Sequence, residues 1–517
     1  YERYVSDFRS IENILDKLFA FQVVEIDEER TIGKQDAFRV FLERNAQLLK
    51  TDGWTGVVVP SAFHANEGAT GIRQLYLGKM ALRHCYSFEN RRKLFEIHSS
   101  SKFATVVAQA GRPTDSASCA FYLHDDEWLF TDHKGREPLQ YDLGFIRRTG
   151  GDYMSLLELR STKDLEVAEA CFAHGEPFGQ VCERLGIRLS RELNMTDDAW
   201  RFTPTVDVLP KAQDPRDPAI ATQVIEHGYL VLHEGKTFRQ YDDHWSTLQR
   251  YFVSIEKLAG KSEWITCACH YRIAYREIAG PGDENVSIWS MLPPGCACGH
   301  KAPLERTPWN LRSADALMIL GIANSFCFDW LLSLKVRASV GAFMRDSISV
   351  PRILASLFIP HSGARLSCNH AGYAGLWQEQ LGVAWREQQK KPFSWPALKG
   401  DEERWAVRAA IDAVVADAYG LSRHQYAHVL STFPHKRYPK APEYCLAMFD
   451  ELKAIGLDAF TKKHDPYWDI PLNENLPQPV IDLPVAEAEQ STVGDPALGS
   501  QFRLSDKPAR QRAKRKR

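Results

Sequence analysis

The apolar run Gly-Val-Val-Val-Pro at 56–60 constrains the fold of this chain more than any other part of its sequence. Residues 34–50 before it carry apolar side chains at helical spacing, and Thr-Asp-Gly at 51–53 supplies a turn between the two segments. A short, wholly apolar run suits a strand that is buried on both faces, as in a parallel sheet under helices. The sequence therefore predicts a strand of an α/β sheet here.

The same alternation of helix and strand continues along the chain. Residues 72–80 predict a second helix, and 83–88, 102–108 and 118–123 predict further strands. This order is typical of an open α/β sheet, which binds its ligands at the carboxyl ends of its strands. Pro60 and Ser61 lie at such an end.

From about residue 150 to 375 the pattern changes. Strand-like segments at 229–233 and 251–255 alternate with turns rich in Gly and Pro, and 347–351 predicts a strand that a proline stops. We expect a separate mixed α/β unit.

One long apolar stretch, 314–336, lies near the end of this unit, with Ser313 as its expected cap. Asn324, Asp329 and Lys335 interrupt it, which favours a core helix over a membrane span. Asn324 and the neighbouring Ser325 are best interpreted as a buried polar pair with satisfied hydrogen bonds.

The third region is helical. Residues 402–419 show a helical apolar face, Gly420 ends it, and Ser422 with Gln425 predicts a capping box for the next helix. Beyond 472 the sequence is rich in Pro, Ala and acidic residues and ends in the basic segment KPARQRAKRKR. That tail could hold nucleic acid or only solubilise the chain. The expected units are 1–150, 151–375, 376–471 and a disordered tail at 472–517.

The composition narrows the class of protein. Of 517 residues, 44 % are hydrophobic and 25 % are charged, which is ordinary for a globular protein and excludes a disordered or collagen-like chain. No run approaches the ~18 apolar residues of a membrane helix, and no signal peptide precedes the first strand, so a cytoplasmic protein is expected. The chain starts at Tyr1 without an initiator Met, which suggests part of a longer polypeptide.

Cysteine and histidine form one cluster in the sequence. Eleven Cys without a secretory signal favour reduced thiols over disulfides. The cluster comprises Cys267, Cys269, His270, Cys296, Cys298 and His300. Both Cys pairs have the spacing CxC, which is less usual in zinc sites than CxxC. Buried thiols are therefore favoured and no metal site is predicted, although zinc stays open.

No complete catalytic motif is present. The sequence contains no GxGxxG, GxxxxGK[ST], HExxH or GxSxG pattern. The only Pro-Pro pair, Pro293-Pro294, follows Leu and precedes Gly, so it does not match the Asn/Asp-Pro-Pro-aromatic tetrapeptide of amino-methyltransferases. No catalytic residue is therefore assigned.

Three blocks, in chain order, nevertheless resemble one known group of enzymes. The first is DAFRVFLERNAQLLKTDGWTGVVVPSAFH (36–64) with IRQLYL (72–77) and FENRRKLFEIHSSSKFATVVAQAG (88–111). It resembles the second half of the catalytic domain of adenine-specific DNA methyltransferases. The relevant members are the large fused restriction–modification enzymes of type IIG style and the related phage-defence methylases.

The other two blocks resemble the rest of the same enzymes. YREIAGPGDENVSIWSMLPPG (275–295), LGIANSFCFDWLLSLKVR (320–337) and ISVPRI (348–353) are similar to their target-recognition domain, which type I specificity subunits share in style. IDAVVADAYGLSRHQYAHVLSTFP (411–434) is similar to their C-terminal helical segment. Together the blocks cover roughly 34–435.

The resemblance implies a fold and a reaction. The fold would be a partial Rossmann-like methyltransferase sheet, then a mixed α/β target-recognition domain and a helical C-terminal region. The parent enzyme would transfer a methyl group from S-adenosylmethionine to adenine N6 in double-stranded DNA, in a bacterial restriction–modification or phage-defence system. The family's cofactor loop and catalytic tetrapeptide lie upstream of the first block, so this chain alone would be inactive. Its partners would be DNA, the upstream catalytic half and possible restriction or defence subunits.

The resemblance also suggests site residues. Methylating a base in a duplex requires flipping it out, and an aromatic ring is the natural surface on which to stack it. Phe95 matches the family's phenylalanine, and Pro60 and Ser61 would line the same pocket. The alternative is that Phe95 is a core residue that caps the sheet.

Basic residues are the candidates for contact with DNA. Arg91, Arg92 and Lys93 would grip phosphates beside the flipped base, although such a run is often only a solvated loop. Arg272, Arg276 and Lys301 are candidates in the recognition region, with plain surface charge as the alternative.

Two rival functions fit parts of the sequence. The first is a non-catalytic DNA-specificity module that acts with a separate methylase subunit. Half a methylase sheet at 34–111 argues against it. The second, a free-standing endonuclease, lacks an acid–acid–lysine cluster.

Overall fold

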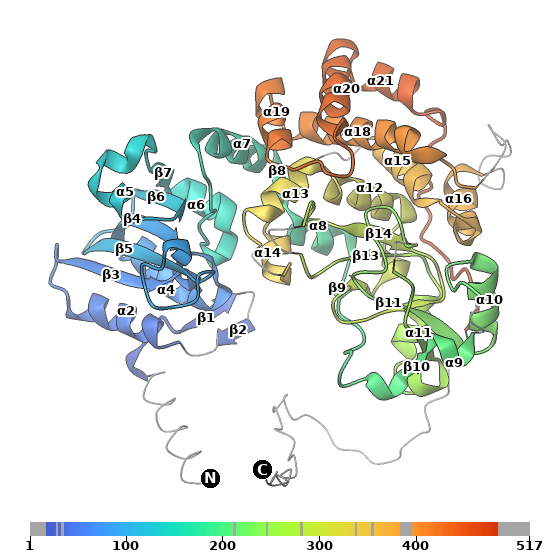
Figure 1. Cartoon of the computed structure of the whole chain (residues 1–517), viewed down its shortest axis with the longest axis horizontal. Helices are drawn as coiled ribbons and strands as arrows, with labels where there is room; N and C mark the ends of the chain where they lie inside the picture. The colour runs from blue at the N-terminus through green and yellow to red at the C-terminus, as the bar shows by residue number, and fades with distance from the viewer. Residues whose placement is uncertain are drawn as a thin grey trace, which may run out of the picture.

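The structure of the chain is a computed structural model (Figure 1). It describes residues 17–26, 29–32, 36–209, 213–244, 247–279, 283–336, 339–352, 356–382 and 395–483. The basic end of the chain, KPARQRAKRKR, lies outside these ranges, so its two possible roles stay open.

The first part of the chain folds around a five-stranded sheet. Its strands are β3 (Trp54–Pro60), β4 (Met80–Glu89), β5 (Lys102–Ala110), β6 (Ser116–Leu123) and β7 (Leu139–Asp142), in the spatial order β3-β5-β4-β6-β7. The main helices beside them are α2 (Ala37–Leu48), α4 (Thr70–Gly78) and α6 (Leu143–Gly150), and a hairpin of β1 (Val23–Ile26) and β2 (Glu29–Ile32) precedes them. The predicted elements at 34–50, 56–60, 72–80, 83–88, 102–108 and 118–123 are all confirmed. We refer to this sheet with its helices as the N-terminal lobe.

The expectation that 56–60 is buried on both faces of a parallel sheet is wrong. β3 runs antiparallel to β5, which also runs antiparallel to β4, and only the β4–β6 pair is parallel. Within the described ranges β3 has a single strand neighbour and lies at the edge of the sheet. Val59 is buried whereas Val58 is 55 % exposed. An apolar run does not show whether both faces of its strand are buried or whether the strand has neighbours on both sides. Both depend on segments far away in the sequence.

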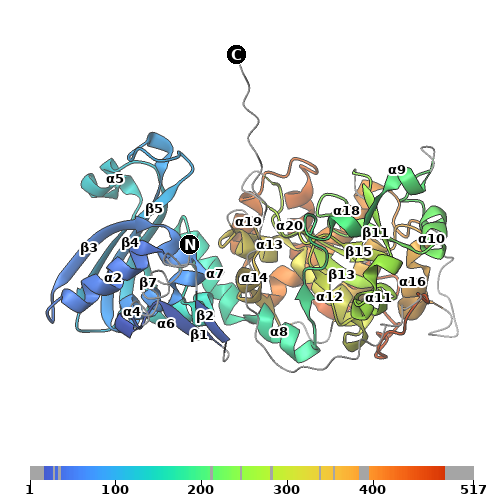
Figure 2. The ribbon, with the colours of Figure 1, turned by 90° about the horizontal axis from the view of Figure 1, so that it is seen from below.

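The rest of the chain forms a second, larger lobe, and Figures 1 and 2 show α7 (Thr162–Ala173) between the two lobes. A capping box of Ser161 and Asp164 starts α7. The larger lobe continues with β8 (Gly175–Pro177), which pairs with β17 (Ser349–Pro351), and with α8 (Phe178–Leu185).

Two four-stranded sheets form the middle of this lobe. One has the order β10 (Phe202–Pro204), β12 (Tyr251–Ser254), β11 (Tyr229–His233), β15 (Cys296–Cys298). The other has the order β14 (Trp289–Leu292), β13 (Arg272–Tyr275), β16 (Leu304–Glu305), β9 (Leu189–Ser190). Helices α9 (Thr205–Val208), α10 (Pro218–Glu226) and α11 (Ser262–Ala268) complete this region. The predicted strands at 229–233 and 251–255 are confirmed as the antiparallel pair β11 and β12.

The long apolar stretch is not one helix, which corrects the prediction. It forms α12 (Ser313–Ala323) and α13 (Phe326–Ser333), bent by 64° at Asn324 and Ser325. Ser325 caps α13, and the Asn324 side chain exchanges two hydrogen bonds with the backbone of Trp289. These bonds compete with helical continuation and confirm that the polar pair is satisfied. Within the described ranges no single helix has the length and apolarity to cross a membrane.

The C-terminal region is helical, as expected. After α14 (Ala342–Asp346) it comprises α15 (Phe358–Ser367), α16 (Ala374–Leu381), α18 (Gly400–Ala418), α19 (Arg423–Ser431), α20 (Ala441–Ile455) and α21 (Leu457–His464). Gly420 ends α18 in the left-handed region at φ 69°, and the capping box of Ser422 and Gln425 is present. The fold class is thus confirmed as mixed α/β followed by helices.

Residues 472–483 do not behave as the predicted disordered tail. The Val480 amide donates to the Cys269 carbonyl at 2.8 Å, and Leu483 is buried. The expected unit boundaries at 150, 375 and 471 stay predictions, because the largest buried cluster contains residues of both lobes.

Candidate nucleic-acid interface

Three phenylalanines pack together at one end of the N-terminal sheet, where β3 and β4 finish. Phe103 is the second residue of β5 and pairs with Pro60 of β3 on one side and Phe88 of β4 on the other. The Phe88 and Phe103 rings stack at 5.4 Å, and Phe95 meets Phe103 edge to face at 4.8 Å. Phe103 is buried, but Phe95 is 46 % exposed. Phe95 therefore presents an open aromatic surface at the carboxyl ends of β3 and β4.

A buried asparagine that the sequence analysis missed holds the loop with Phe95. The Phe95 amide donates to Oδ1 of Asn90 at 3.0 Å, and Nδ2 of Asn90 donates to the carbonyls of Phe95 and Ile97 at 2.9 Å each. Lys93 takes a left-handed φ of 53° in this turn. The only sequence signal was an asparagine between a strand and a polar run, which is typical of a turn. Asn90 thus fixes the position of the half-exposed Phe95.

The predicted basic run, Arg91, Arg92 and Lys93, forms the first part of this loop. Arg91 forms an ion pair with Glu89 at 2.6 Å and Arg92 forms one with Asp125 at 3.1 Å, while both arginine side chains stay about two-thirds exposed, at 67 % and 63 %. Exposed ion pairs of this kind contribute little to stability, so their carboxylates can be exchanged for phosphates at small cost. The structure places the run beside Phe95 at the end of the sheet. Its contact with phosphates stays a prediction.

Beneath the phenylalanines lies a network of charged side chains from distant segments. Lys102 Nζ lies 3.0 Å from Glu158 and 3.4 Å from Glu89, and His64 Nε2 lies 3.0 Å from the other oxygen of Glu158. The Ser61 amide donates to the carbonyl of Lys102 at 3.2 Å, and Ser61 is buried. No pattern in the sequence predicted this network, because its members come from four separate segments of the chain.

The charges of this network act on Glu89. Burial on its own would raise the pKa of this carboxyl, but Lys102 and Arg91 outweigh burial and hold the pKa below its ordinary value. Glu89 is therefore ionised at neutral pH and orients two cations at the sheet edge.

The predicted DNA contact of Arg272 is contradicted by its burial. Arg272 is 2 % exposed, it lies 2.9 Å from Glu192, and Arg306 contacts the same carboxylate at 2.7 Å. Arg272 also donates to the carbonyl of Cys296. The side chain is therefore occupied by partners inside the protein and is not free to contact DNA.

Arg276 and Lys301 instead line an open cleft of about 330 Å³. The other residues around it are Met195, Glu234, Gly235, Lys236, Ile278, Asp283 and Gly299. Arg276 donates to the Phe238 carbonyl at 2.9 Å, and Lys301 lies 3.2 Å from Glu277. Burial lowers the pKa of Arg276, with Asp283 opposing it. The cleft brings two of the three predicted recognition-region cations together.

The six Cys and His residues of the sequence cluster do not converge in the described part of the chain. Cys267 lies on α11 and its thiol contacts the Arg306 carbonyl at 3.2 Å, whereas Cys296 and Cys298 lie on β15. His300 accepts the Met195 amide. Among the described residues, the group of three that could hold a metal is a different one, Asp243, His244 and His370.

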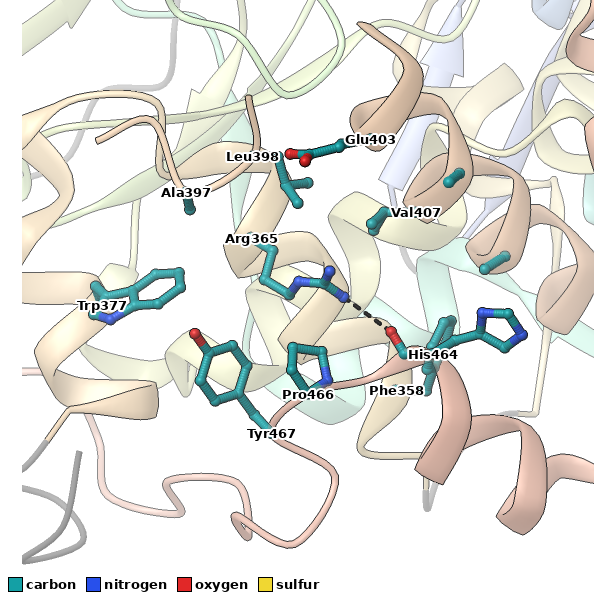
Figure 3. Close-up of a pocket in the computed structure, with 12 residues that line it drawn as sticks. Phe358, Arg365, Trp377, Ala397, Leu398, Glu403, Val407, His464, Pro466 and Tyr467 are labelled. Atoms are coloured by element: carbon teal, nitrogen blue, oxygen red, sulfur yellow. Dashed lines mark hydrogen bonds between the residues drawn. The ribbon is translucent and has the colours of Figure 1, made fainter. Parts of the chain in front are cut away.

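A second cleft, of about 390 Å³, lies among the C-terminal helices (Figure 3). Figure 3 shows Trp377 and Tyr467 on one side of Arg365, which donates to the His464 carbonyl at 3.2 Å. Burial lowers the pKa of Arg365, and Asp465 opposes it. No prediction from the sequence concerned this cleft.

Comparisons with known proteins find only distant likenesses. No protein-family model and no curated protein match the chain. Among solved structures, the type IIL restriction–modification enzyme MmeI in complex with DNA has a TM-score of 0.39 at 9 % identity, over 81 % of this chain and 53 % of that one. The DrdV–DNA complex has a TM-score of 0.37 at 11 % identity, over 71 % and 42 %. The type IIG restriction endonuclease BpuSI has 0.29 at 9 %, over 79 % and 50 %.

This chain thus spans about half the length of the MmeI chain. With TM-scores below 0.5, these likenesses carry no argument about fold or activity.

Proposed function

We propose that this chain is the carboxyl-terminal part of an adenine-N6 DNA methyltransferase of a restriction–modification or phage-defence system. The observation that carries the proposal is the half-exposed Phe95, which lies at the carboxyl edge of the N-terminal sheet with Arg91, Arg92 and Lys93 beside it. In this proposal a flipped adenine stacks on the ring of Phe95 while the basic run holds the neighbouring phosphates.

The supporting residues have distinct parts in this proposal. Asn90 fixes the Phe95 loop through three hydrogen bonds, so the stacking surface is already in position before DNA binds. In this proposal Pro60 and Ser61, at the end of β3, would line the pocket for the flipped adenine. In the larger lobe, Arg276 and Lys301 line a cleft that suits contact with the DNA backbone.

Methyl transfer itself is proposed to need a second polypeptide segment. The chain has no glycine loop and no Asn-Pro-Pro-aromatic motif, so its residues do not fit S-adenosylmethionine, and we derive no chemical step through this cofactor. The edge strand β3, with Trp54 58 % and Val58 55 % exposed, is where a strand of a cofactor-binding half could add to the sheet. Restriction or defence subunits are proposed as further partners.

DNA binding across a salt series, combined with selection from random sites, tests the proposal. We expect an enriched short motif and an affinity that falls steeply with salt, because phosphate contacts release counterions. Binding no stronger than that of the isolated peptide KPARQRAKRKR would overturn the recognition assignment.

Phe95→Ala tests the stacking role. With 2-aminopurine at the target adenine, we expect the variant to lose the fluorescence increase of a flipped base and to bind ~5–150-fold more weakly, equivalent to about 1–3 kcal/mol. Phe130→Ala is the matched control, since Phe130 is an 80 % exposed phenylalanine of the same lobe. Equal behaviour of the two variants would contradict the role of Phe95.

A further inference from the structure

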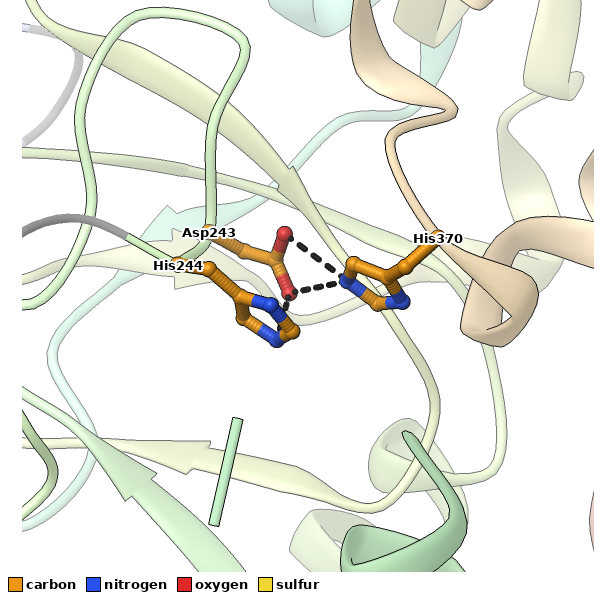
Figure 4. Close-up of side chains that lie close together, drawn as sticks. All are labelled: Asp243, His244 and His370. Atoms are coloured by element: carbon orange, nitrogen blue, oxygen red, sulfur yellow. Dashed lines mark hydrogen bonds and ion pairs between the residues drawn. The ribbon is translucent and has the colours of Figure 1, made fainter. Parts of the chain in front are cut away.

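Three potential metal ligands from distant segments meet in the larger lobe (Figure 4). Asp243 and His244 lie between β11 and β12, and His370 caps the short helix η8 (Ala371–Tyr373). Nε2 of His370 lies 3.1 Å from both carboxylate oxygens of Asp243, and Nε2 of His244 lies 3.3 Å from one of them. One ligand atom from each of the three side chains falls within 4.8 Å of the other two.

These separations match those of a metal coordination shell. At a tetrahedral zinc ion with bonds of about 2.0–2.2 Å, neighbouring ligand atoms lie roughly 3.3 Å apart. Two imidazole nitrogens and one carboxylate oxygen are ligands that zinc accepts, and three protein ligands leave a fourth position for water. The donor set therefore fits in both chemistry and spacing.

The burial of the three side chains also suits an ion. The Asp243 side chain is 1 % exposed, whereas those of His370 and His244 are 14 % and 26 % exposed, so an ion could reach the site from their side. Within the described residues no Lys or Arg nitrogen lies within 4.0 Å of the Asp243 carboxylate. A buried carboxylate without a Lys or Arg partner lacks a permanent compensating charge, which a divalent cation would supply.

The two histidine rings lie face to face beside the Asp243 carboxylate (Figure 4). They stack at 4.0 Å with an interplanar angle of 4°. Because an imidazole nitrogen binds a metal in the plane of its ring, at least one of the two rings must turn when an ion binds. Nδ1 of His370 accepts the Gly372 amide at 3.1 Å, so Nε2 carries the ring proton that it donates to Asp243. A metal at Nε2 would shift that proton to Nδ1 and release the Gly372 amide. His370 would thus exchange two hydrogen bonds, one to Asp243 and one from Gly372, for a metal bond.

We propose that Asp243, His244 and His370 form a binding site for a divalent first-row metal ion, with zinc as the ion that fits best. The ion would join the loop before β12 to the segment between α15 and α16, which otherwise meet through the Asn369 side chain and the Tyr241 carbonyl. The site is independent of Phe95 and of the proposed methyl transfer, and it is distinct from the Cys and His cluster in the sequence.

Titration of the chelator-treated full chain with zinc, followed by calorimetry, tests the proposal. We expect one ion per chain and a rise in the melting temperature on binding. His244→Ala and His370→Ala should each lower zinc affinity by at least ~10-fold. Cobalt bound in place of zinc should show the intense visible absorption of a tetrahedral site in the parent chain and lose it in both variants.

His428→Ala is the matched control, because His428 pairs with Asp164 at 2.7 Å and its side chain is 20 % exposed. This change should leave zinc affinity unaltered. If His370→Ala does not fold, zinc binding by His244→Ala and the cobalt spectrum of the parent chain test the proposal instead. Zinc binding that is absent, or that is the same in His244→Ala and in the parent chain, would overturn the proposal and identify the group as a hydrogen-bonded His–Asp–His cluster.

Discussion

Two groups of arginines in this protein show how differently the same residue type is used. In the N-terminal lobe, Arg91 and Arg92 each pair with one carboxylate and stay about two-thirds exposed. In the larger lobe, Arg272 and Arg306 share Glu192 in an interior where all three side chains are 2 % exposed. An exposed pair can release its carboxylate for a phosphate, whereas a buried pair cannot open without leaving a charge unpaired in the interior.

The largest expected effect on stability is that of Glu192→Gln, which removes the carboxylate shared by the two buried arginines. It leaves the buried Arg272 without a carboxylate partner and Arg306 with only the exposed Glu263 at 3.7 Å, so we expect the free energy of unfolding to fall by ~3–5 kcal/mol. Urea denaturation measures the loss. Glu234→Gln is the control, since Glu234 pairs with the half-exposed Arg250 and its loss should cost less than about 1 kcal/mol. Similar losses in both variants would contradict the distinction.

Glu305→Gln tests how the pH dependence of stability reflects a buried carboxyl near Arg272. Burial raises the pKa of Glu305 to about 8, with Arg272 opposing it, against 4.5 in an unfolded chain. Between these two values the folded protein holds a proton that the unfolded chain has lost, so this group makes the protein less stable as pH rises. Glutamine has no proton to lose.

We therefore expect Glu305→Gln to gain stability relative to the parent chain from pH 5 to pH 8, by up to a few kcal/mol. Thermal melts at both pH values measure the difference. An unchanged difference between variant and parent across that range would show that Glu305 is not protonated in the folded protein.

The smallest effect on stability is expected at the exposed basic run. Replacing Arg91, Arg92 and Lys93 together by alanine should change the free energy of unfolding by only ~0.5 kcal/mol per position. DNA affinity should nevertheless fall, and the slope of log affinity against log salt should become shallower by about 0.9 for each phosphate that the run no longer neutralises. Fluorescence anisotropy between ~50 and 200 mM salt measures this slope. An unchanged slope would mean that the run is only a solvated loop.

The local elements of the N-terminal lobe were predictable from the sequence. The helix α2, the strands β3 to β6 and, farther along the chain, the capping box of Ser422 and Gln425 each depend on spacing within a few residues, and the structure contains all of them. The break at Asn324 and Ser325 was not predicted. It is decided by the hydrogen bonds between Asn324 and Trp289, a residue 35 positions away.

The candidate site was only partly accessible from the sequence. Spacing placed Pro60 and Ser61 at a strand end, whereas Phe95 was suggested by the resemblance to adenine methyltransferases and the basic run by its position before Phe95. The structure brings all of them to one end of the sheet. Asn90 and the network around Lys102 were missed, because a buried hydrogen-bond partner has no periodic signal of its own.

By itself, the sequence determined the main helices and strands of the N-terminal lobe, the pair β11 and β12, and that an α/β region precedes a helical one. Local periodicity and capping carry this information. Only the tertiary structure decided that β3 lies at an edge, that Arg272 is buried while Arg276 lines a cleft, and that His370 meets Asp243 and His244. These outcomes depend on contacts between segments far apart in the chain, where exposure and charge partners are set by packing rather than by neighbouring residues.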